Sequence, residues 1–311
     1  MGEEPLVSVV ILNYNKKERL RECMDSALGL DWPNLEVIVV DNASSDGSAE
    51  MVESDYKGQV GLVRREENSV TGGRNDGFRA ARGEFMLSLD NDIQLPDKAV
   101  IRKGVEIFER YPEAGVLAFR IGDPDDPDRH LPEHWWHPIP LEEGVDRFFR
   151  TTYFTESAIL MRAEAYQATG GYDEKFFMQA EYADLGLKLM GAGFEILYCP
   201  NLGCIEVEVR GQLAPKKSRA HYLNLRNKLW TAWKHYPLGR GLAYGSARIA
   251  AAAYRSVRYG WVGYFLAGTR DGVFAPKAIR EQRRPLPPDV WKEIDRIAAG
   301  WLIDDVDTES R

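Results

Sequence analysis

The sequence Leu87-Ser88-Leu89-Asp90-Asn91-Asp92-Ile93 is an apolar run that ends in two carboxylates spaced by one residue. Apolar β-forming residues predict a buried strand, and the two acids then emerge together where that strand ends. Carboxylate oxygens in this position suit Mg²⁺ or Mn²⁺, which can share its remaining coordination sites with substrate phosphates. Asp-Asn-Asp is also common in turns, so the stretch alone leaves a turn and a metal site equally open.

Three earlier apolar runs also end in polar residues. Residues 7–12 are followed by Asn13, residues 35–40 by Asp41, and residues 60–63 by the polar residues 66–68. Continuous apolar strands separated by helical patterns predict an α/β fold with a mostly parallel sheet buried on both faces. Ligands of such sheets bind beyond the carboxyl ends of the strands, so the four polar clusters predict one binding rim.

A glycine pair, Gly72-Gly73, and then Arg74 begin the helix that follows the third strand. Glycine at a helix start lets a ligand approach the backbone closely, and the arginine adds a cation. Glycine pairs also mark plain turns, and this segment alone favours the turn.

The second half of the chain continues the pattern with a helix over residues 98–110 and strands over residues 116–121, 157–161 and 194–198. Between them, residues 122–150 hold His130, His134 and His137 among prolines and tryptophans. We expect no metal at these histidines, because a Pro-rich loop lacks the ordering partners that a metal site needs. An aromatic acceptor-binding loop and a flexible loop stay open.

Two acids, Glu181 and Asp184, begin the helix that runs to about residue 190. Acids in the first turn of a helix interact favourably with its dipole. They can equally supply a general base in a cleft. The segment alone does not decide between these roles.

Composition excludes several classes of protein. The 311 residues carry a net charge of −8, which argues against nucleic-acid binding. Three cysteines show neither a disulfide framework nor zinc spacing, so a reducing cytoplasm is expected, with Cys23 in the core. We expect no signal peptide, and no apolar run has the roughly 20 residues of a membrane span.

The C-terminal part differs in charge from the rest, so we predict a catalytic domain over residues 1–236 and a helical extension over residues 237–311. Residues 236–285 hold nine Lys or Arg but only two acids, interleaved with aromatic residues. A basic, aromatic helical pair suits an anionic membrane surface and would make the protein peripheral on the inner face of the membrane. A helical hairpin that packs its aromatics on the core is slightly favoured.

With these motifs in order, residues 6–236 resemble the inverting family 2 glycosyltransferases, which have the nucleotide-diphospho-sugar fold called GT-A. The matching segments are residues 9–15, residues 39–48, residues 72–77, residues 90–92 and residues 171–177. Five motifs in one order are far more specific than any single motif. The form of residues 39–48 and of residues 222–227 looks most like the rhamnosyltransferase branch.

The resemblance implies a nucleoside-diphosphate sugar donor, dTDP- or UDP-linked, with rhamnose among the candidate sugars. It also implies a hydroxyl acceptor on a glycan, a lipid-linked sugar or a secondary metabolite. It implies a divalent Mg²⁺ or Mn²⁺ bound by Asp90 and Asp92. The residues that it places around the donor are Leu12, Asn13, Tyr14, Asp41, Asn68, Gly73, Arg74, Asn75, Asp90 and Asn91.

The sequence departs from the family pattern at two positions. The family usually has Glu-Asp-x-Asp-Leu with the first Asp as general base, and here Tyr182 stands in that place. Because a phenol titrates near pH 10, we predict that Glu181 takes the role, with Asp184 in reserve. The family's metal-binding His corresponds to Glu206, which can also ligate Mg²⁺ or Mn²⁺.

Two other functions stay open. A sugar-phosphate nucleotidyltransferase shares the architecture, but it usually needs a Gly- and Arg-rich loop after the first strand, where residues 13–17 read Asn-Tyr-Asn-Lys-Lys. A catalytically degenerate sugar-nucleotide-binding partner fits the missing base. Intact acids at Asp90 and Asp92 argue against it.

Overall fold

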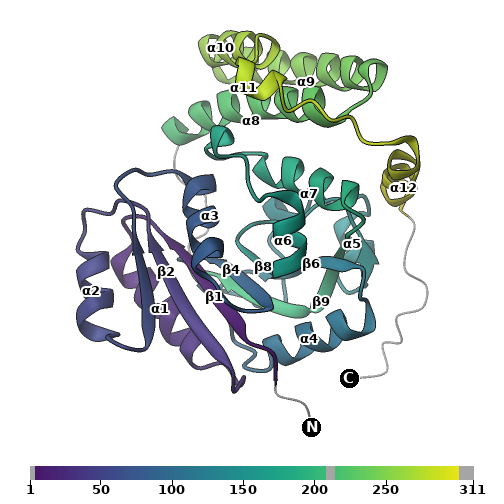
Figure 1. Ribbon diagram of the computed structural model, residues 1–311. Coiled ribbons are helices and arrows are strands. Elements are labelled where there is room, and N and C mark those ends of the chain that lie inside the picture. The colour runs from purple at the N-terminus through teal and green to yellow at the C-terminus, as the bar shows by residue number, and fades with distance from the viewer. Residues whose placement is uncertain (1–3, 208–213, 301–311) are drawn as a thin grey trace.

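The computed structural model describes residues 4–207 and 214–300, in which one mixed sheet has the strand order β3-β2-β1-β4-β8-β6-β9-β5, with β7 paired to β9 (Figure 1). The predicted strands are confirmed to within a few residues at most of their ends. Their bounds are β1 Val7–Asn13, β2 Leu35–Asp41, β3 Val60–Arg64, β4 Phe85–Asp90, β5 Ile93–Gln94, β6 Ala114–Gly122, β7 Phe149–Arg150, β8 Ala158–Arg162 and β9 Glu195–Glu206.

The first four strands are parallel, as their continuous apolar sequences predict. The register pairs Asn13 with Asp41 and Leu12 with Asp90, so the polar residues at the strand ends lie side by side. Strand β8 is antiparallel to both β4 and β6. The long segment between β6 and β8 returns the chain to the carboxyl edge of β4, and residues just before β8 therefore lie at the binding rim.

Helices cover both faces of the sheet. One hydrophobic core lies between the sheet and helices α1, α2 and α4, and a second lies between the sheet and α3, α6 and α7. Cys23 is buried in the first core, as predicted. The helices are α1 Lys17–Leu28, α2 Ser48–Asp55, α3 Val70–Ala80, α4 Val100–Arg110, α5 Leu141–Gly144, α6 Ala163–Thr169 and α7 Glu181–Gly191.

Strand β9 is longer than the sequence predicts. It continues past Tyr198 to Glu206, with an irregular register where Phe119 pairs with Cys199 and Arg120 with Gly203. A bulge of this kind tolerates Pro200 within a strand, since proline cannot complete a regular ladder. The end of β9 then pairs with β5, and Ile93 lies opposite Glu206.

The C-terminal helices form a layer at one end of the molecule, above α3 and α7 in Figure 1. The predicted catalytic domain, residues 1–236, includes helix α8. In the structure α8 packs on both α9 and α10 of the predicted extension through a shared apolar cluster. The last described helix, α12, returns to pack against α7. The bounds are α8 Ala214–His235, α9 Leu238–Tyr259, α10 Val262–Val273, α11 Lys277–Arg280 and α12 Pro288–Ala298.

Aromatic and aliphatic side chains of α9 and α10 remain exposed. Tyr254 is 69% exposed, Val257 78% and Phe274 78%. The favoured prediction, a hairpin that packs its aromatics on the core, is therefore wrong for Tyr254, and also for Tyr259 and Tyr264. Within the described residues, no helix combines the length and the apolar character that a membrane crossing requires.

Candidate active site

Polar side chains at the ends of β1, β2 and β4 form one hydrogen-bonded rim. Asn13 donates to the Asp41 carboxylate at 3.2 Å and accepts from the Asn91 amide at 2.7 Å. Asn42 donates to Asn68 at 2.9 Å and continues the rim toward α3. Tyr14 is 45% exposed beside it. The predicted donor residues Asn13, Tyr14, Asp41, Asn68 and Asn91 thus gather at one edge of the sheet.

Helix α3 contributes Val70 and Arg74 to the cavity beyond this rim. The Arg74 guanidinium donates to Asp90 at 2.7 Å and to Ser88 at 2.9 Å. Asn75 instead hydrogen-bonds the backbone of Tyr172 and the carboxylate of Glu174, so its amide anchors the chain between α6 and α7.

The glycines of α3 leave space for side chains of the neighbouring strand β1. A Cβ at Gly73 would lie 2.5 Å from Leu12 Cδ1, and one at Gly77 would lie 2.4 Å from Val10. Glycine here lets α3 pack closely on β1. We predicted that Gly73 leaves space for an approaching ligand, but the Leu12 side chain fills that space. Leu12 is itself one of the residues that line the cavity described below.

Three acids predicted as metal ligands lie at the end of β4 and β9. Asp92 is buried, and its Oδ2 contacts the Lys16 ammonium at 2.7 Å. Backbone pairing brings Glu206 beside it, since Val207 N donates to the Asp92 carbonyl at 2.9 Å. Burial, and then the charge on Asp90, raise the pKa of Asp92 despite Lys16, and Glu206 adds to the effect.

The described residues are suited to a metal ion that is coordinated partly by protein carboxylates and partly by a bound ligand. No group of three or more His, Cys, Asp or Glu side chains in the described ranges is arranged to hold a metal by itself. Asp92 Oδ1 is buried and has no hydrogen-bond partner among those residues. A hard cation that keeps sites for a diphosphate needs only one or two protein carboxylates, which Asp90, Asp92 and Glu206 can supply.

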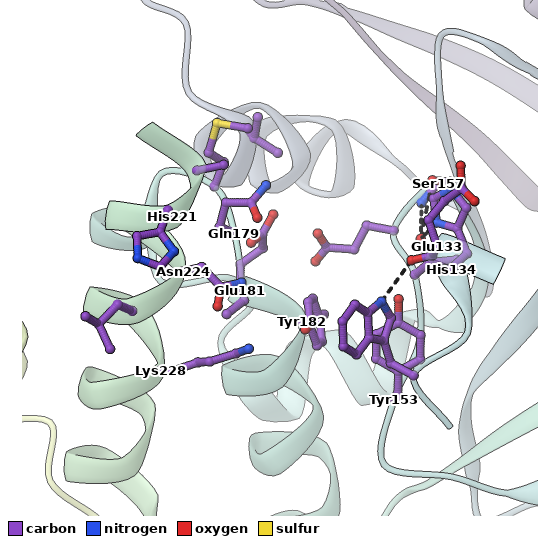
Figure 2. Close-up of a pocket in the computed structure, with 18 of the residues that line it drawn as sticks. Glu133, His134, Tyr153, Ser157, Gln179, Glu181, Tyr182, His221, Asn224 and Lys228 are labelled. Carbon is purple, nitrogen blue, oxygen red and sulfur yellow. Dashed lines mark hydrogen bonds between the residues drawn. The ribbon is translucent and has the colours of Figure 1, made fainter. Parts of the chain in front are cut away.

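A cavity of about 590 Å³ opens beyond the rim (Figure 2). Leu12, Arg74 and Asp90 line it on the side of the sheet, and residues of α8 and α9, together with Trp261 between α9 and α10, line it on the side of the C-terminal helices. The cavity is also lined by residues of the short 3-10 helix Pro132–His134 and the segment after it, of the segment before β8, and of the start of α7 and the loop before it, namely Glu133, His134, Trp136, Tyr153, Thr155, Glu156, Ser157, Gln179, Glu181 and Tyr182.

Two buried glutamates, Glu156 and Glu181, lie within hydrogen-bonding reach of each other in this cavity. Burial raises the pKa of Glu156 well above its ordinary value, and the charge on Glu181 adds to the shift. Burial also raises the pKa of Glu181, against the hydrogen bond from Glu156. Both carboxyls are therefore harder to ionise than exposed glutamates, and the hydrogen bond from Glu156 makes Glu181 the more readily ionised of the two, as the role of general base requires.

A strained loop presents Glu181 to the cavity. Phe177, Gln179 and Ala180 have positive φ angles of 67°, 72° and 60°, which are uncommon for residues other than glycine. Asn227 on α8 holds this loop, because its buried amide donates to the carbonyls of Phe176, Met178 and Gln179 at 3.1, 2.9 and 2.6 Å. Strain of this kind persists where surrounding contacts over-determine it, as they do here.

Asp184 and Tyr182 differ from Glu181 in their surroundings. Asp184 accepts from Lys234 at 2.6 Å and from His235 at 2.8 Å, and these contacts tie α7 to α8 behind the cavity wall. Burial raises the pKa of Tyr182, so even less of its basic phenolate form is present at neutral pH than in water. The reserve candidate Asp184 is thus engaged in ion pairs, and Glu181 is the predicted base that lines the cavity.

The histidine loop is ordered by specific partners, so our expectation of a loop without ordering contacts is wrong. His134 contacts Glu206 at 2.8 Å and Thr155 at 3.2 Å, and His137 contacts Thr151 at 2.8 Å. Burial lowers the pKa of His130 to about 4, so this side chain is neutral at pH 7. Glu133, His134 and Trp136 line the cavity, as an acceptor-binding loop would.

The sequence analysis missed several residues that the fold brings to the site. Glu156 precedes β8 and reaches the rim only because that strand is antiparallel. An acid just before a strand is a usable signal once strand direction is known. Lys16 and Asn227 give no local signal in the sequence. Their hydrogen-bond partners lie 76 and at least 48 positions away in the chain, respectively.

A mostly parallel sheet with an acidic rim and a cavity beyond it defines a nucleotide-diphospho-sugar transferase fold, GT-A. The family model "Glycosyl transferase family 2" matches residues 8–170, just over half of the chain, and the chain belongs to this family.

The chain is similar to curated proteins from several bacteria. It is 25% identical over 238 residues to the O-antigen biosynthesis protein RfbC of Myxococcus xanthus, which covers 70% of this chain. It is 32% identical over 102 residues to the poly(ribitol-phosphate) beta-glucosyltransferase of Bacillus spizizenii, which covers 31%. The chain spans only 18% and 16% of the length of these two relatives.

Two solved structures share the fold at low sequence identity. The mannosyltransferase PcManGT of Pyrobaculum calidifontis, in complex with GDP-Man and Mn²⁺, has a TM-score of 0.59 and 18% identity, covering 88% of this chain and 89% of its own. S. aureus TarS 1-349, in complex with UDP-GlcNAc, has a TM-score of 0.55 and 16% identity, covering 94% and 81%.

Proposed function

We propose that the chain is an inverting, metal-dependent glycosyltransferase that moves a sugar from a nucleoside-diphosphate donor to an acceptor hydroxyl. One observation carries this proposal: a single cavity is lined by Asp90, Arg74 and the Glu156–Glu181 pair. The donors in the two neighbouring structures, GDP-Man and UDP-GlcNAc, support a nucleotide sugar. We keep dTDP- or UDP-linked sugars, rhamnose among them, as the first donors to test.

The donor would lie along the rim at the strand ends. In this proposal Asp41, oriented by Asn13, accepts a hydrogen bond from the base, and Asp90 lies near the ribose. Asp92, Asp90 and Glu206 would hold Mg²⁺ or Mn²⁺, which neutralises charge on the departing nucleoside diphosphate. Lys16 holds the Asp92 carboxylate in place and can move to a phosphate oxygen when the donor binds.

The acceptor would enter from the side of the Glu156–Glu181 pair. Its hydroxyl oxygen attacks the anomeric carbon from the face opposite the leaving group, and the carbon–oxygen bond to the diphosphate breaks. The hydroxyl proton passes to Glu181, and Glu156, whose pKa is raised further, donates the hydrogen bond that supports Glu181 as the acceptor of this proton. Arg74, which lies close enough to both carboxyls to affect the pKa of each, limits the rise in their pKa values and keeps one of them ionised.

A thermal-shift screen of nucleoside diphosphates and their sugars, with Mn²⁺ or with a chelator, tests the donor half. Ligands that bind only the native state raise its stability, so one nucleotide should raise the melting temperature in Mn²⁺ alone. Asp92→Asn should abolish that shift, and Asp97→Asn, at a partly exposed ion pair with Lys103, should preserve it. No response to any nucleotide would favour a degenerate partner protein instead.

We also propose that α9 and α10 contact an anionic membrane. Their exposed apolar side chains, such as Val257 and Leu242, lie on helices that also carry arginines. Apolar burial and attraction to acidic headgroups act together on such a surface.

Co-sedimentation with vesicles tests this contact. The chain should bind vesicles that contain acidic phospholipid more strongly than neutral ones. Val257→Asp should weaken that binding, and Gln59→Asp, an equal charge change at an exposed position before β3, should not. Equal recovery with both vesicle types would refute the proposal.

A further inference from the structure

Three cations from the C-terminal layer line the cavity opposite the donor rim. Lys228 comes from α8, and Arg248 and Arg255 come from α9. The two arginines are seven residues apart, about two helical turns, so they lie on one face of α9. In Figure 2, Lys228 extends from α8 across the cavity toward Tyr182.

None of these cations has an acidic partner within the described ranges 4–207 and 214–300. Other cations of the same layer are paired: Lys234 contacts Asp173 and Asp184, and Arg240 contacts Asp295. The Nε of Arg248 is buried, and it has no hydrogen-bond partner in the described part of the chain. Burial and the charges of Arg248 and Arg255 lower the pKa of Lys228 to about 8, which shows how closely the three cations gather.

Placing three cations close together, one of them with a buried N–H donor that is unpaired among the described residues, costs free energy unless an anion binds to them. Like charges repel, and a buried donor without an acceptor loses its hydration. The acids that line the cavity are Asp90, Glu133, Glu156 and Glu181. Glu156 and Glu181 lie within hydrogen-bonding reach of each other, and Asp90 already contacts Arg74 at 2.7 Å. The three cations therefore fit a ligand that brings several anionic oxygens, for which lysine and arginine are the usual partners.

We propose that Lys228, Arg248 and Arg255 bind a phosphate or diphosphate group of the acceptor and so direct its hydroxyl toward the Glu156–Glu181 pair. This inference rests on the proposed glycosyl transfer and names the acceptor class for it. In the proposed function the donor diphosphate belongs at the rim acids Asp90 and Asp92, of which Asp90 lines this cavity. Two sources share the chemistry, a polyol phosphate and a lipid-linked diphosphate.

Calorimetric titration of the full chain with inorganic pyrophosphate tests the site. A chelator in the buffer removes the divalent metal, so the donor rim cannot hold pyrophosphate through a cation. Lys228→Met and Arg248→Gln should each weaken binding on the order of tenfold, because each removes a charge-assisted contact. Arg258→Gln, the same charge change at an exposed position of α9, is the matched control and should bind as the wild type does.

The nucleotide response in Mn²⁺ separates this inference from the proposed function. Both variants should keep the melting-temperature rise caused by the nucleoside diphosphate, which also shows that they fold. If the wild type lacks that rise, the proposed function fails. If the rise is present but pyrophosphate binds equally to Arg248→Gln and Arg258→Gln, or does not bind, the phosphate site is overturned.

Two further titrations identify the source of the phosphate. Glycerol 3-phosphate represents a polyol phosphate, and a short prenyl diphosphate in detergent micelles represents a lipid-linked acceptor. The compound that binds the wild type more tightly, and whose affinity Lys228→Met lowers as it lowers that for pyrophosphate, identifies the class of acceptor. Absence of that loss for both compounds would refute the site.

Discussion

Replacing Asp184 by asparagine separates a structural acid from a catalytic one. Asp184 is 1% exposed, forms ion pairs with Lys234 at 2.6 Å and Lys188 at 3.2 Å, and accepts a hydrogen bond from His235 at 2.8 Å. Breaking a buried ion pair by removing one partner costs about 3–5 kcal/mol, because the other charge stays buried. Lys234 keeps Asp173 at 3.1 Å, so we expect the lower end, about 3 kcal/mol.

The pH dependence of this effect has a definite sign. Burial would raise the pKa of Asp184, but the hydrogen bond from His235 and the charges of Lys188 and Lys234 outweigh it and hold the pKa well below its ordinary value. A depressed folded-state pKa stabilises the protein above the unfolded value of about 3.9, and this stability is lost as pH falls toward the folded-state pKa. Asp184→Asn should therefore lose most stability at pH 7 and differ least from the wild type in acid.

Urea unfolding followed by tryptophan fluorescence measures the change. The control is Asp295→Asn, which breaks a surface pair with Arg240 and should cost less than about 1 kcal/mol. An Asp184→Asn protein within that same range at pH 7, but with turnover as low as that of Glu181→Gln, would refute our reasoning and return Asp184 to candidacy as the base.

Three further predictions concern the carboxyl pair and its loop. Glu181→Gln should lower turnover by about 10²–10⁴-fold, typical of losing a general base, and full turnover in a sugar-transfer assay would exclude this residue as the base. Glu156→Gln should raise the melting temperature at pH 7 to 8 and lose that gain below about pH 4. The reason is that a carboxyl with a raised pKa in the folded state makes the wild type less stable as pH rises. A melting temperature below the wild-type value at pH 8 would contradict this. Asn227→Leu should cost about 1–3 kcal/mol in urea unfolding by leaving three carbonyls without their donor, and an unchanged free energy of unfolding would show that water replaces the amide.

The strand ends that form the donor rim could be read from the sequence. Apolar runs of strand length, each followed by a polar cluster, specify parallel strands whose carboxyl ends share one edge. Asn13, Asp41 and Asp90 therefore gather at one edge in the structure as predicted. The polarity of each segment is a local property, which is why pattern alone was sufficient.

The acceptor side of the cavity depends on contacts that local pattern does not contain. Glu156 reaches the rim because β8 enters the sheet antiparallel, and Glu206 reaches Asp92 because a bulge lets β9 continue beyond Pro200. The basic wall forms because α8 and α9 pack together over the cavity. Sequence by itself determined the class of sheet and the acids at its edge. Only the tertiary structure decided that Glu156 and the cations Lys228, Arg248 and Arg255 line the same cavity as Asp90, because chain reversal and helix docking bring distant residues together.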